Sequence, residues 1–176
     1  MLLRKNNMIY IFRGKAATGK TTLTDMLSRE LHIPVFRKDD FFDVLTEYDF
    51  ETGLLNNMSY NLLTKVIQTN IDLNNNVIID IGLCHKPYII EFINKINFRN
   101  KKVFNFLCVC SDDEVWKERI NARIKNPAPN QKMFKTLEQV MSHYNSCDIS
   151  PLENEIVIDS ANNINGIFQN IMDIIN

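Results

Sequence analysis

The chain has 176 residues, enough for one domain or for one domain with a small lid. Its 20 basic and 21 acidic residues give a net charge of −1, which argues against a strongly basic nucleic-acid-binding protein. Hydrophobic residues make up 45% of the chain, which excludes an intrinsically disordered protein.

Short apolar runs alternate with amphipathic stretches along the whole chain. Five strands are predicted, at MIYIF (8–12), VF (35–36), VIID within NNNVIIDIG (74–82), VFNFLCVC (103–110) and EIVID (155–159). Helices are predicted between and after them, with apolar residues at helical spacing: Leu23/Met26/Leu27/Leu31, Phe41/Val44/Leu45/Tyr48, about 58–73, Ile89/Ile90/Ile93/Ile96, about 112–125, Leu137/Val140/Met141/Tyr144 and Ile164/Ile167/Phe168/Ile171. This alternation predicts an α/β fold whose parallel sheet is covered by helices on both faces. We expect residues 1–176 to form a single domain.

Nothing in the sequence indicates export or membrane insertion. The first twelve residues, MLLRKNNMIYIF, lack the long apolar core and the small-residue cleavage site of a secretory signal. No apolar run approaches the roughly 18 residues that span a membrane. The four cysteines are scattered, which is typical of reduced thiols. We therefore expect a cytoplasmic protein with no membrane partner.

The segment from Gly14 to Thr21, GKAATGKT, fits the phosphate-loop pattern G-x-x-x-x-G-K-[ST] at every fixed position. A predicted strand precedes it and a predicted helix follows, as such a loop requires. Its glycines let successive backbone amides wrap a phosphate chain, Lys20 is expected to reach the β- and γ-phosphates, and the Thr21 hydroxyl is expected to ligate Mg²⁺. The ATP-binding residues expected in this loop are Gly14, Ala16, Ala17, Thr18, Gly19, Lys20, Thr21 and Thr22.

Carboxylates follow the second and third predicted strands, at the edge of a parallel sheet where ligands bind. Asp39 and Asp40 come after the second strand, and a carboxylate there can accept the proton of a hydroxyl that attacks the γ-phosphate. Either aspartate can instead cap the next helix, and we assign the base to Asp39 and the cap to Asp40. Asp80 ends the third strand and is a candidate Mg²⁺ ligand, with a simple turn residue as the alternative.

Two arginines lie four residues apart on the helix that follows the fourth strand. This spacing places Arg119 and Arg123 on one helix face, while Trp116 and Ile120 belong to a separate apolar stripe that packs inward. A break, NPAPNQK, follows, and together they predict a short lid over about residues 119–135. Guanidinium groups in such a lid can neutralise a phosphoryl group in transfer. The alternative is a solvated basic face.

The three segments GKAATGKT, KDD and ERINAR, in this order and spacing, resemble those of P-loop kinases. The similar groups are small predicted kinases of zeta-toxin-like or ATPase type, antibiotic and gluconate kinases, and the kinase domain of phage polynucleotide kinase. The resemblance covers nearly the whole chain and implies a P-loop NTPase fold with strand order 2-3-1-4-5. It also implies that Asp39 is the general base, that Arg119 and residues 160–163 border the adenine, and that Arg123 is a lid arginine that touches the phosphates.

The expected activity is therefore ATP- and Mg²⁺-dependent transfer of a phosphate to a hydroxyl of a small molecule. Polynucleotide kinase carries an arginine three residues after its base, where this chain has Phe42, and no Lys or Arg follows Lys135. Nucleic acid is thus not the expected acceptor, and the shikimate-kinase acceptor pattern is absent. The alternatives are a nucleoside or polynucleotide 5′-hydroxyl kinase and a nucleotide-binding regulatory NTPase. A regulator needs no acceptor base, so Asp39 and Arg123 favour a kinase. The sequence does not indicate an oligomeric state.

Overall fold

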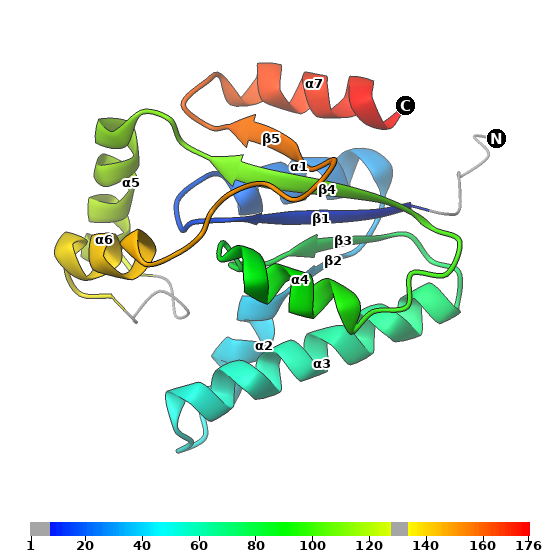
Figure 1. Cartoon of the computed structure of the whole chain (residues 1–176), viewed down its shortest axis with the longest axis horizontal. Coiled ribbons are helices and arrows are strands. Elements are labelled where there is room, and N and C mark those ends of the chain that lie inside the picture. The colour runs from blue at the N-terminus through cyan, green and yellow to red at the C-terminus, as the bar shows by residue number, and fades with distance from the viewer. Residues whose placement is uncertain (1–7, 128–133) are drawn as a thin grey trace.

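The computed structural model describes residues 8–127 and 134–176. At its centre is a five-stranded sheet in which every neighbouring pair is parallel, in the order β2-β3-β1-β4-β5 (Figure 1). The strands are β1 (Met8–Gly14), β2 (Val35–Arg37), β3 (Val77–Asp80), β4 (Lys102–Val109) and β5 (Ile156–Asp159). This confirms the predicted α/β class and the predicted strand order.

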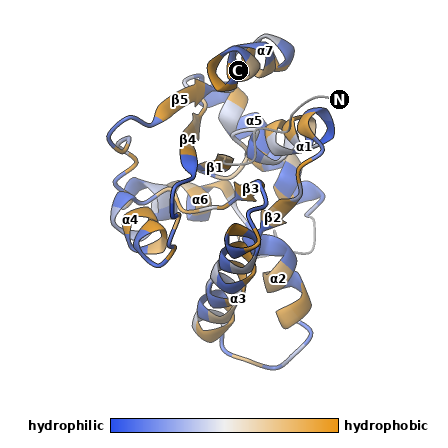
Figure 2. Ribbon diagram, turned by 90° about the vertical axis from the view of Figure 1, so that its right-hand side faces the viewer, coloured by the Kyte–Doolittle hydropathy of each residue, from blue (hydrophilic) through white to orange (hydrophobic). Residues whose placement is uncertain are grey.

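Helices cover both faces of the sheet, and two more lie beyond the carboxyl ends of its strands (Figure 1). They are α1 (Lys20–Leu31), α2 (Lys38–Leu45), α3 (Thr52–Asp72), α4 (Lys86–Asn94), α5 (Asp113–Lys125), α6 (Leu137–Asn145) and α7 (Ile164–Ile175). Helices α1 and α7 pack on one face, and α3 and α4 pack on the other (Figures 1 and 2). Helices α5 and α6 stand beyond the carboxyl ends of the strands. Of the predicted lid, residues 119–125 lie in α5, and residues 128–133 are outside the described part.

The apolar side chains of the central strand β1 account for the helices on both faces of the sheet. Ile9 and Ile11 pack toward α3 and α4, whereas Tyr10 and Phe12 pack toward α1 and α7. Successive side chains of a strand point to opposite faces, and all four are buried. Burying each such side chain contributes about 1.5–3 kcal/mol. A strand that is apolar on both sides must therefore lie inside a sheet that is covered twice.

The predicted apolar stripe on α2 is largely wrong. Phe41 packs against the core beneath α3 and α4, but Val44 is 60% exposed. The helix ends at Leu45, so Tyr48, which is 58% exposed, does not share its face. Phe50 is also exposed, and the aromatic side chains after Asp40 therefore divide between the core and the surface.

The structure bears on two features considered in the sequence, membrane-spanning helices and the state of the cysteines. In residues 8–127 and 134–176, no helix combines the length and the apolarity that crossing a bilayer requires. All four cysteines, which are Cys84, Cys108, Cys110 and Cys147, carry free thiols.

Gly14→Ala is expected to destabilise the fold severely, by at least about 3 kcal/mol. Gly14 has a φ of 144°, which L residues rarely adopt, and an added Cβ would lie 2.1 Å from the carbonyl oxygen of Cys108 on β4. Urea unfolding of the variant measures the loss. The matched control is Gly82→Ala, because a Cβ at that glycine meets nothing within 4 Å. Equal, small losses for the two variants would contradict the prediction.

Candidate active site

The loop between β1 and α1 has the backbone of a phosphate-binding turn. Gly14 and Gly19 have positive φ angles of 144° and 81°, and Ala17 is also left-handed with a φ of 63°. A left-handed alanine is strained, and such strain persists where a functional geometry is imposed. Helix α1 has Gly19 as its N-cap, with no side-chain cap and no acidic residue in its first turn. Its first amides and its positive end can therefore face an anion.

Lys20 is folded back over this loop. Its Nζ donates to the carbonyl oxygens of Gly14 at 3.1 Å and Lys15 at 2.8 Å. The buried Thr18 also donates its hydroxyl to the Lys15 carbonyl, at 2.9 Å. Thr22 is exposed on the first turn of α1. Lys20 thus lies on the inner side of the loop, where a bound phosphate would compete with carbonyl oxygens for its ammonium group.

Thr21 and Asp80 lie together, as a magnesium site requires. The Thr21 hydroxyl donates to Oδ2 of Asp80 at 2.9 Å, and Thr24 donates to the same oxygen at 3.4 Å. A hydroxyl and a carboxylate are oxygen ligands of the kind that Mg²⁺ prefers, so these residues fit the ion. Among the described residues, no cluster of three or more His, Cys, Asp or Glu side chains could hold a metal. Phosphate oxygens and water would therefore have to supply most of the coordination.

An arginine that the sequence analysis did not assign compensates the buried Asp80 charge. Arg37 ends β2, and its Nε lies 3.6 Å from Oδ2 of Asp80. The same guanidinium pairs with Asp25 of α1. Asp80 is only 7% exposed, and a buried carboxylate needs such a partner. The position of Arg37 at the end of the predicted second strand, with Lys38 between it and the aspartate pair, is the only sequence signal for this role.

The prediction that Asp40 caps α2 is wrong. The N-cap residue is Arg37, and no side chain caps this helix, so Asp39 and Asp40 both lie in its first turn. Carboxylates are favourable there because of the helix dipole. Burial and the charges of Asp39, Asp80 and Asp25 raise the pKa of Asp40, although Arg37 acts in the opposite direction. Asp40 therefore lies toward the Asp80 side of the site.

Asp39 has a different environment. Its side chain is 52% exposed, and Oδ1 lies 3.7 Å from Nζ of the buried Lys38, whose ammonium lies 3.9 Å from the centre of the Phe42 ring. Burial raises the pKa of Tyr60 on α3, and the Asp39 charge adds to this rise. The same charge opposes the lowering of the Arg123 pKa by burial. The charge of Asp39 thus acts on Tyr60 of α3 and on Arg123 of α5.

The two arginines of α5 have different environments. Arg119 donates to the hydroxyl and to the carbonyl oxygen of Ser160, both at 2.9 Å. A Cβ added at Gly19 would lie 3.5 Å from the Ser160 Cβ, so this pair borders the end of the phosphate loop. Arg123 is half-buried and makes no hydrogen bond or ion pair with any residue in the described ranges. Arg119 is therefore fixed to the loop after β5, whereas the guanidinium of Arg123 has no such partner within residues 8–127 and 134–176.

Two aromatic side chains that the sequence analysis did not assign hold the phosphate loop. Trp116 Nε1 donates to the Ala16 carbonyl oxygen at 2.9 Å, and the Ala16 N–H donates to the Tyr144 hydroxyl at 2.9 Å. The two rings meet edge to face with centroids 6.0 Å apart, and burial raises the pKa of Tyr144 to about 12. The apolar stripe on α5 predicted that Trp116 is buried, but not what its indole bonds. Helices α5 and α6 are thus both tied to the loop.

A buried ion pair fixes the segments around the end of β1. The side chain of Arg13 is 1% exposed, and its Nε and one terminal nitrogen donate to the two carboxylate oxygens of Glu155 at 2.7 and 2.6 Å. Two of its three remaining N–H groups donate to the carbonyl oxygens of Cys84 at 2.8 Å and Ser150 at 3.0 Å. Both carboxylate oxygens of Glu155 and four of the five N–H groups of Arg13 are therefore hydrogen-bonded, which stabilises the buried ion pair. No local sequence pattern predicts this pairing.

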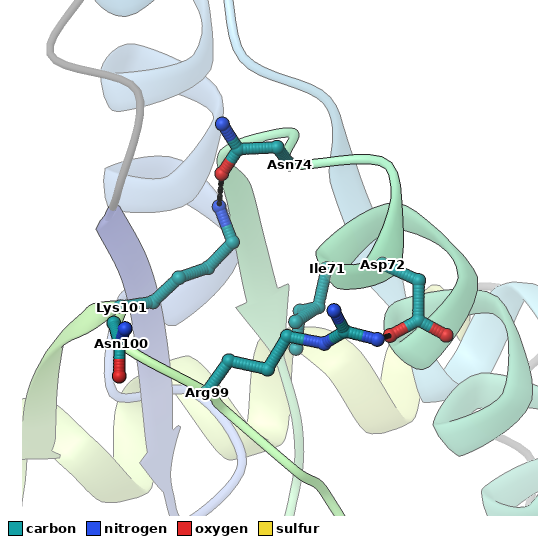
Figure 3. Close-up of a pocket in the computed structure, with 6 residues that line it drawn as sticks. All are labelled: Ile71, Asp72, Asn74, Arg99, Asn100 and Lys101. Atoms are coloured by element: carbon teal, nitrogen blue, oxygen red, sulfur yellow. Dashed lines mark hydrogen bonds and ion pairs between the residues drawn. The ribbon is translucent and has the colours of Figure 1, made fainter.

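A pocket lies at the opposite end of the sheet, and the charged side chains that line it bind one another or a neighbouring amide. Arg99 pairs with Asp72 at 2.7 Å, and Lys101 donates to Asn74 at 3.2 Å (Figure 3). The lining residues are Ile71, Asp72, Asn74, Arg99, Asn100 and Lys101. They lie near the end of α3 and the start of β4, away from the phosphate loop, and we assign them no part in the nucleotide site.

Asp40→Asn is expected to stabilise the protein at neutral pH. Because the pKa of Asp40 is raised in the folded state, its ionised form destabilises the fold above that raised pKa, and this effect disappears as the pH falls below the ordinary value of 3.8. Calorimetry should show a melting temperature higher by up to about 4 °C at pH 7 and a difference that closes near pH 3. A lower melting temperature at pH 7 would instead mean that the attraction to Arg37 dominates.

The fold is shared with solved structures of kinases. A protein predicted to be a kinase, from Chloroflexus aurantiacus, has a TM-score of 0.76 and 21% identity, covering 96% of this chain and 98% of that chain. A sugar kinase from Janibacter sp. has a TM-score of 0.67 and 15% identity, covering 95% of this chain and 93% of that chain. A gluconokinase from Sinorhizobium meliloti has a TM-score of 0.61 and 10% identity, covering 93% of this chain and 88% of that chain. At these identities the likeness shows the fold, and it confirms the predicted P-loop kinase architecture.

Comparison with curated proteins found no match. A family model described as an AAA domain matches residues 9–146, which include the phosphate loop, both aspartates after β2 and both arginines of α5. Because the match spans most of the chain, the protein belongs to this AAA-domain family.

Proposed function

We propose that the protein is an ATP- and Mg²⁺-dependent kinase that transfers the γ-phosphate to a hydroxyl of a small molecule. The observation that carries this proposal is the environment of Asp39. Its carboxylate is half-exposed at the carboxyl end of β2, on the same side of the sheet as the phosphate loop and within electrostatic reach of Arg123. A sugar kinase and a gluconokinase are among the proteins of the same fold, which supports a small hydroxyl compound as the acceptor.

ATP would bind through its phosphates to the loop amides, the amino end of α1 and Lys20. Arg119 and Ser160 border the end of the loop and would line the nucleoside side. Thr21 and Asp80 would hold Mg²⁺, which supplies positive charge to the phosphate oxygens when it is bound. In this arrangement the Thr21 hydroxyl would turn from Asp80 to the ion.

In the transfer step, the acceptor oxygen attacks the γ-phosphorus as the bond from that phosphorus to the bridging oxygen breaks and ADP leaves. The proton of the acceptor hydroxyl passes to Asp39, which later releases it to water. Lys20 and Arg123 would neutralise charge on the equatorial oxygens during transfer. Arg123 suits this role because no acidic group in the described ranges pairs with it.

The charge distribution argues against a polynucleotide acceptor. Such an acceptor needs several phosphate contacts from basic side chains, whereas the net charge is −1 and no Lys or Arg follows Lys135. Phe42 occupies the position where polynucleotide kinase has an arginine, and its ring is in cation–π contact with the Lys38 ammonium. A regulatory NTPase, the other alternative, would need no base at Asp39.

Transfer from γ-labelled ATP to a panel of acceptors tests the proposal. The panel contains sugars, polyols, hydroxy acids, nucleosides and an oligonucleotide with a free 5′-hydroxyl, with Lys20→Ala as the inactive control. We expect label on a small hydroxyl compound. Efficient oligonucleotide labelling with a steep salt dependence would favour the polynucleotide kinase instead. Hydrolysis of ATP without label on any acceptor would favour the regulatory NTPase.

Asp39→Asn is expected to lower kcat by about 10²–10⁴ while the KM for ATP stays nearly unchanged, because a base acts on the acceptor and not on the nucleotide. Steady-state kinetics with the identified acceptor measure both constants. Asp40→Asn is the matched control and should have a smaller effect on kcat. The reverse order of the two effects would assign the base to Asp40.

Arg123→Ala is expected to lower kcat by about 10³, because its guanidinium would meet charge that develops only during transfer. Arg119→Ala should mainly raise the KM for ATP, because it loosens Ser160 beside the loop. The ratio of the effects on kcat and KM separates the two roles. Equal, small effects from both substitutions would make both arginines surface charges.

A further inference from the structure

Lys15 is the one charged side chain of the phosphate loop to which the proposed function gives no task. Its Nζ lies 4.9 Å from the centre of the Trp116 ring and 5.7 Å from the centre of the Tyr144 ring. It forms no ion pair with a carboxylate in residues 8–127 and 134–176. Within the described part of the chain, the ammonium group of Lys15 is therefore held by two aromatic faces and by no carboxylate.

We propose that Lys15 binds the γ-phosphate of ATP and that the Trp116–Tyr144 pair holds its ammonium group until the nucleotide arrives. This inference rests on the proposed function only in taking ATP as the ligand of the loop. A cation–π contact is weak where water reaches it, whereas an ammonium–phosphate hydrogen bond is charge-assisted. A triphosphate can therefore draw the ammonium away from the rings.

The position of Lys15 favours the γ-phosphate over the rest of the nucleotide. Its own carbonyl oxygen accepts from Lys20, so its backbone lies beside the lysine that the loop pattern assigns to the β- and γ-phosphates. Its side chain points toward Tyr144, and Tyr144 is close enough to Arg123 to influence the pKa of that guanidinium. Lys15 thus lies on the Arg123 side of the loop, whereas Arg119 and Ser160 mark the nucleoside side.

The charge balance also calls for an anion at this place. Three cationic side chains, Lys15, Lys20 and Arg123, gather around the loop and α5, and none has a carboxylate within ion-pairing distance in the described ranges. Asp39 and Asp80 act on Arg123 only from beyond ion-pairing distance, so the three like charges are incompletely compensated and repel one another. The triphosphate of ATP supplies this counter-charge, and more of it than ADP does.

Titration calorimetry with ADP and with a non-hydrolysable ATP analogue, in the presence of Mg²⁺, tests the proposal. For Lys15→Met we expect an analogue Kd about tenfold weaker, as for the loss of one charge-assisted hydrogen bond, and an ADP Kd within about twofold of the wild type. Lys15→Arg should restore most of the analogue affinity. Trp116 is the only tryptophan, so its fluorescence reports departure of the Lys15 ammonium from its ring. In the wild type, the analogue should change this fluorescence more than ADP does. In Lys15→Met, the analogue and ADP should change it equally.

The matched control is Lys102→Met. Lys102 also lies over an aromatic ring, 4.4 Å from the centre of Phe104, but at the start of β4, at the other end of the sheet. It should leave both affinities unchanged.

Three results would overturn the proposal: unchanged analogue affinity in Lys15→Met, equal weakening of ADP and analogue, or no binding of the analogue by the wild type. Equal weakening would show that Lys15 only supports the loop. A wild type that binds the analogue but phosphorylates no acceptor would remove the kinase proposal, while the comparison of ADP with the analogue would still decide the role of Lys15.

Discussion

The buried ion pair between Arg13 and Glu155 is the constraint on which the site depends. Arg13 belongs to β1, the central strand, and its guanidinium also binds the carbonyl oxygens of Cys84, after β3, and Ser150, before β5. One side chain thus joins three segments that surround the exit of β1. Removing either charge would leave the other buried and unpaired, which typically costs about 3–5 kcal/mol. The phosphate loop begins at the next residue, Gly14, so its starting point is fixed by this pair.

From that point the loop is held on two sides. Toward the sheet, the close approach of Gly14 to Cys108 sets its first residue against β4. On the side of α5 and α6, Trp116 donates to the carbonyl oxygen of Ala16, and the Ala16 N–H donates to the Tyr144 hydroxyl. A loop that must present several amides to one anion gains from being held before the anion arrives, because less conformational entropy is then lost on binding.

Much of the fold could be predicted from the sequence because it follows from local patterns. Apolar runs of strand length alternating with amphipathic helices define the parallel sheet, and the spacing from Gly14 to Thr21 defines the loop. The strand order came from the resemblance. Contacts that join distant segments could not be predicted: Arg13 with Glu155, Trp116 with Ala16 and Arg37 with Asp80 have no local signature. The error at Asp40 has a related cause. Two adjacent aspartates before a helix look alike in sequence, and only the helix start at Lys38 places both inside the first turn.

The apolar cluster under α5 and α6 is separate from the two clusters that cover the sheet. It consists of a few buried side chains, among them Ala17, Trp116 and Tyr144, so part of the phosphate loop belongs to it. Regions with few buried apolar contacts open locally more often than the rest of a protein. Opening of these two helices would release Ala16 from both of its aromatic partners while the sheet stays intact. The free energy of that local opening, and not the stability of the whole domain, would then govern how readily the nucleotide enters and leaves.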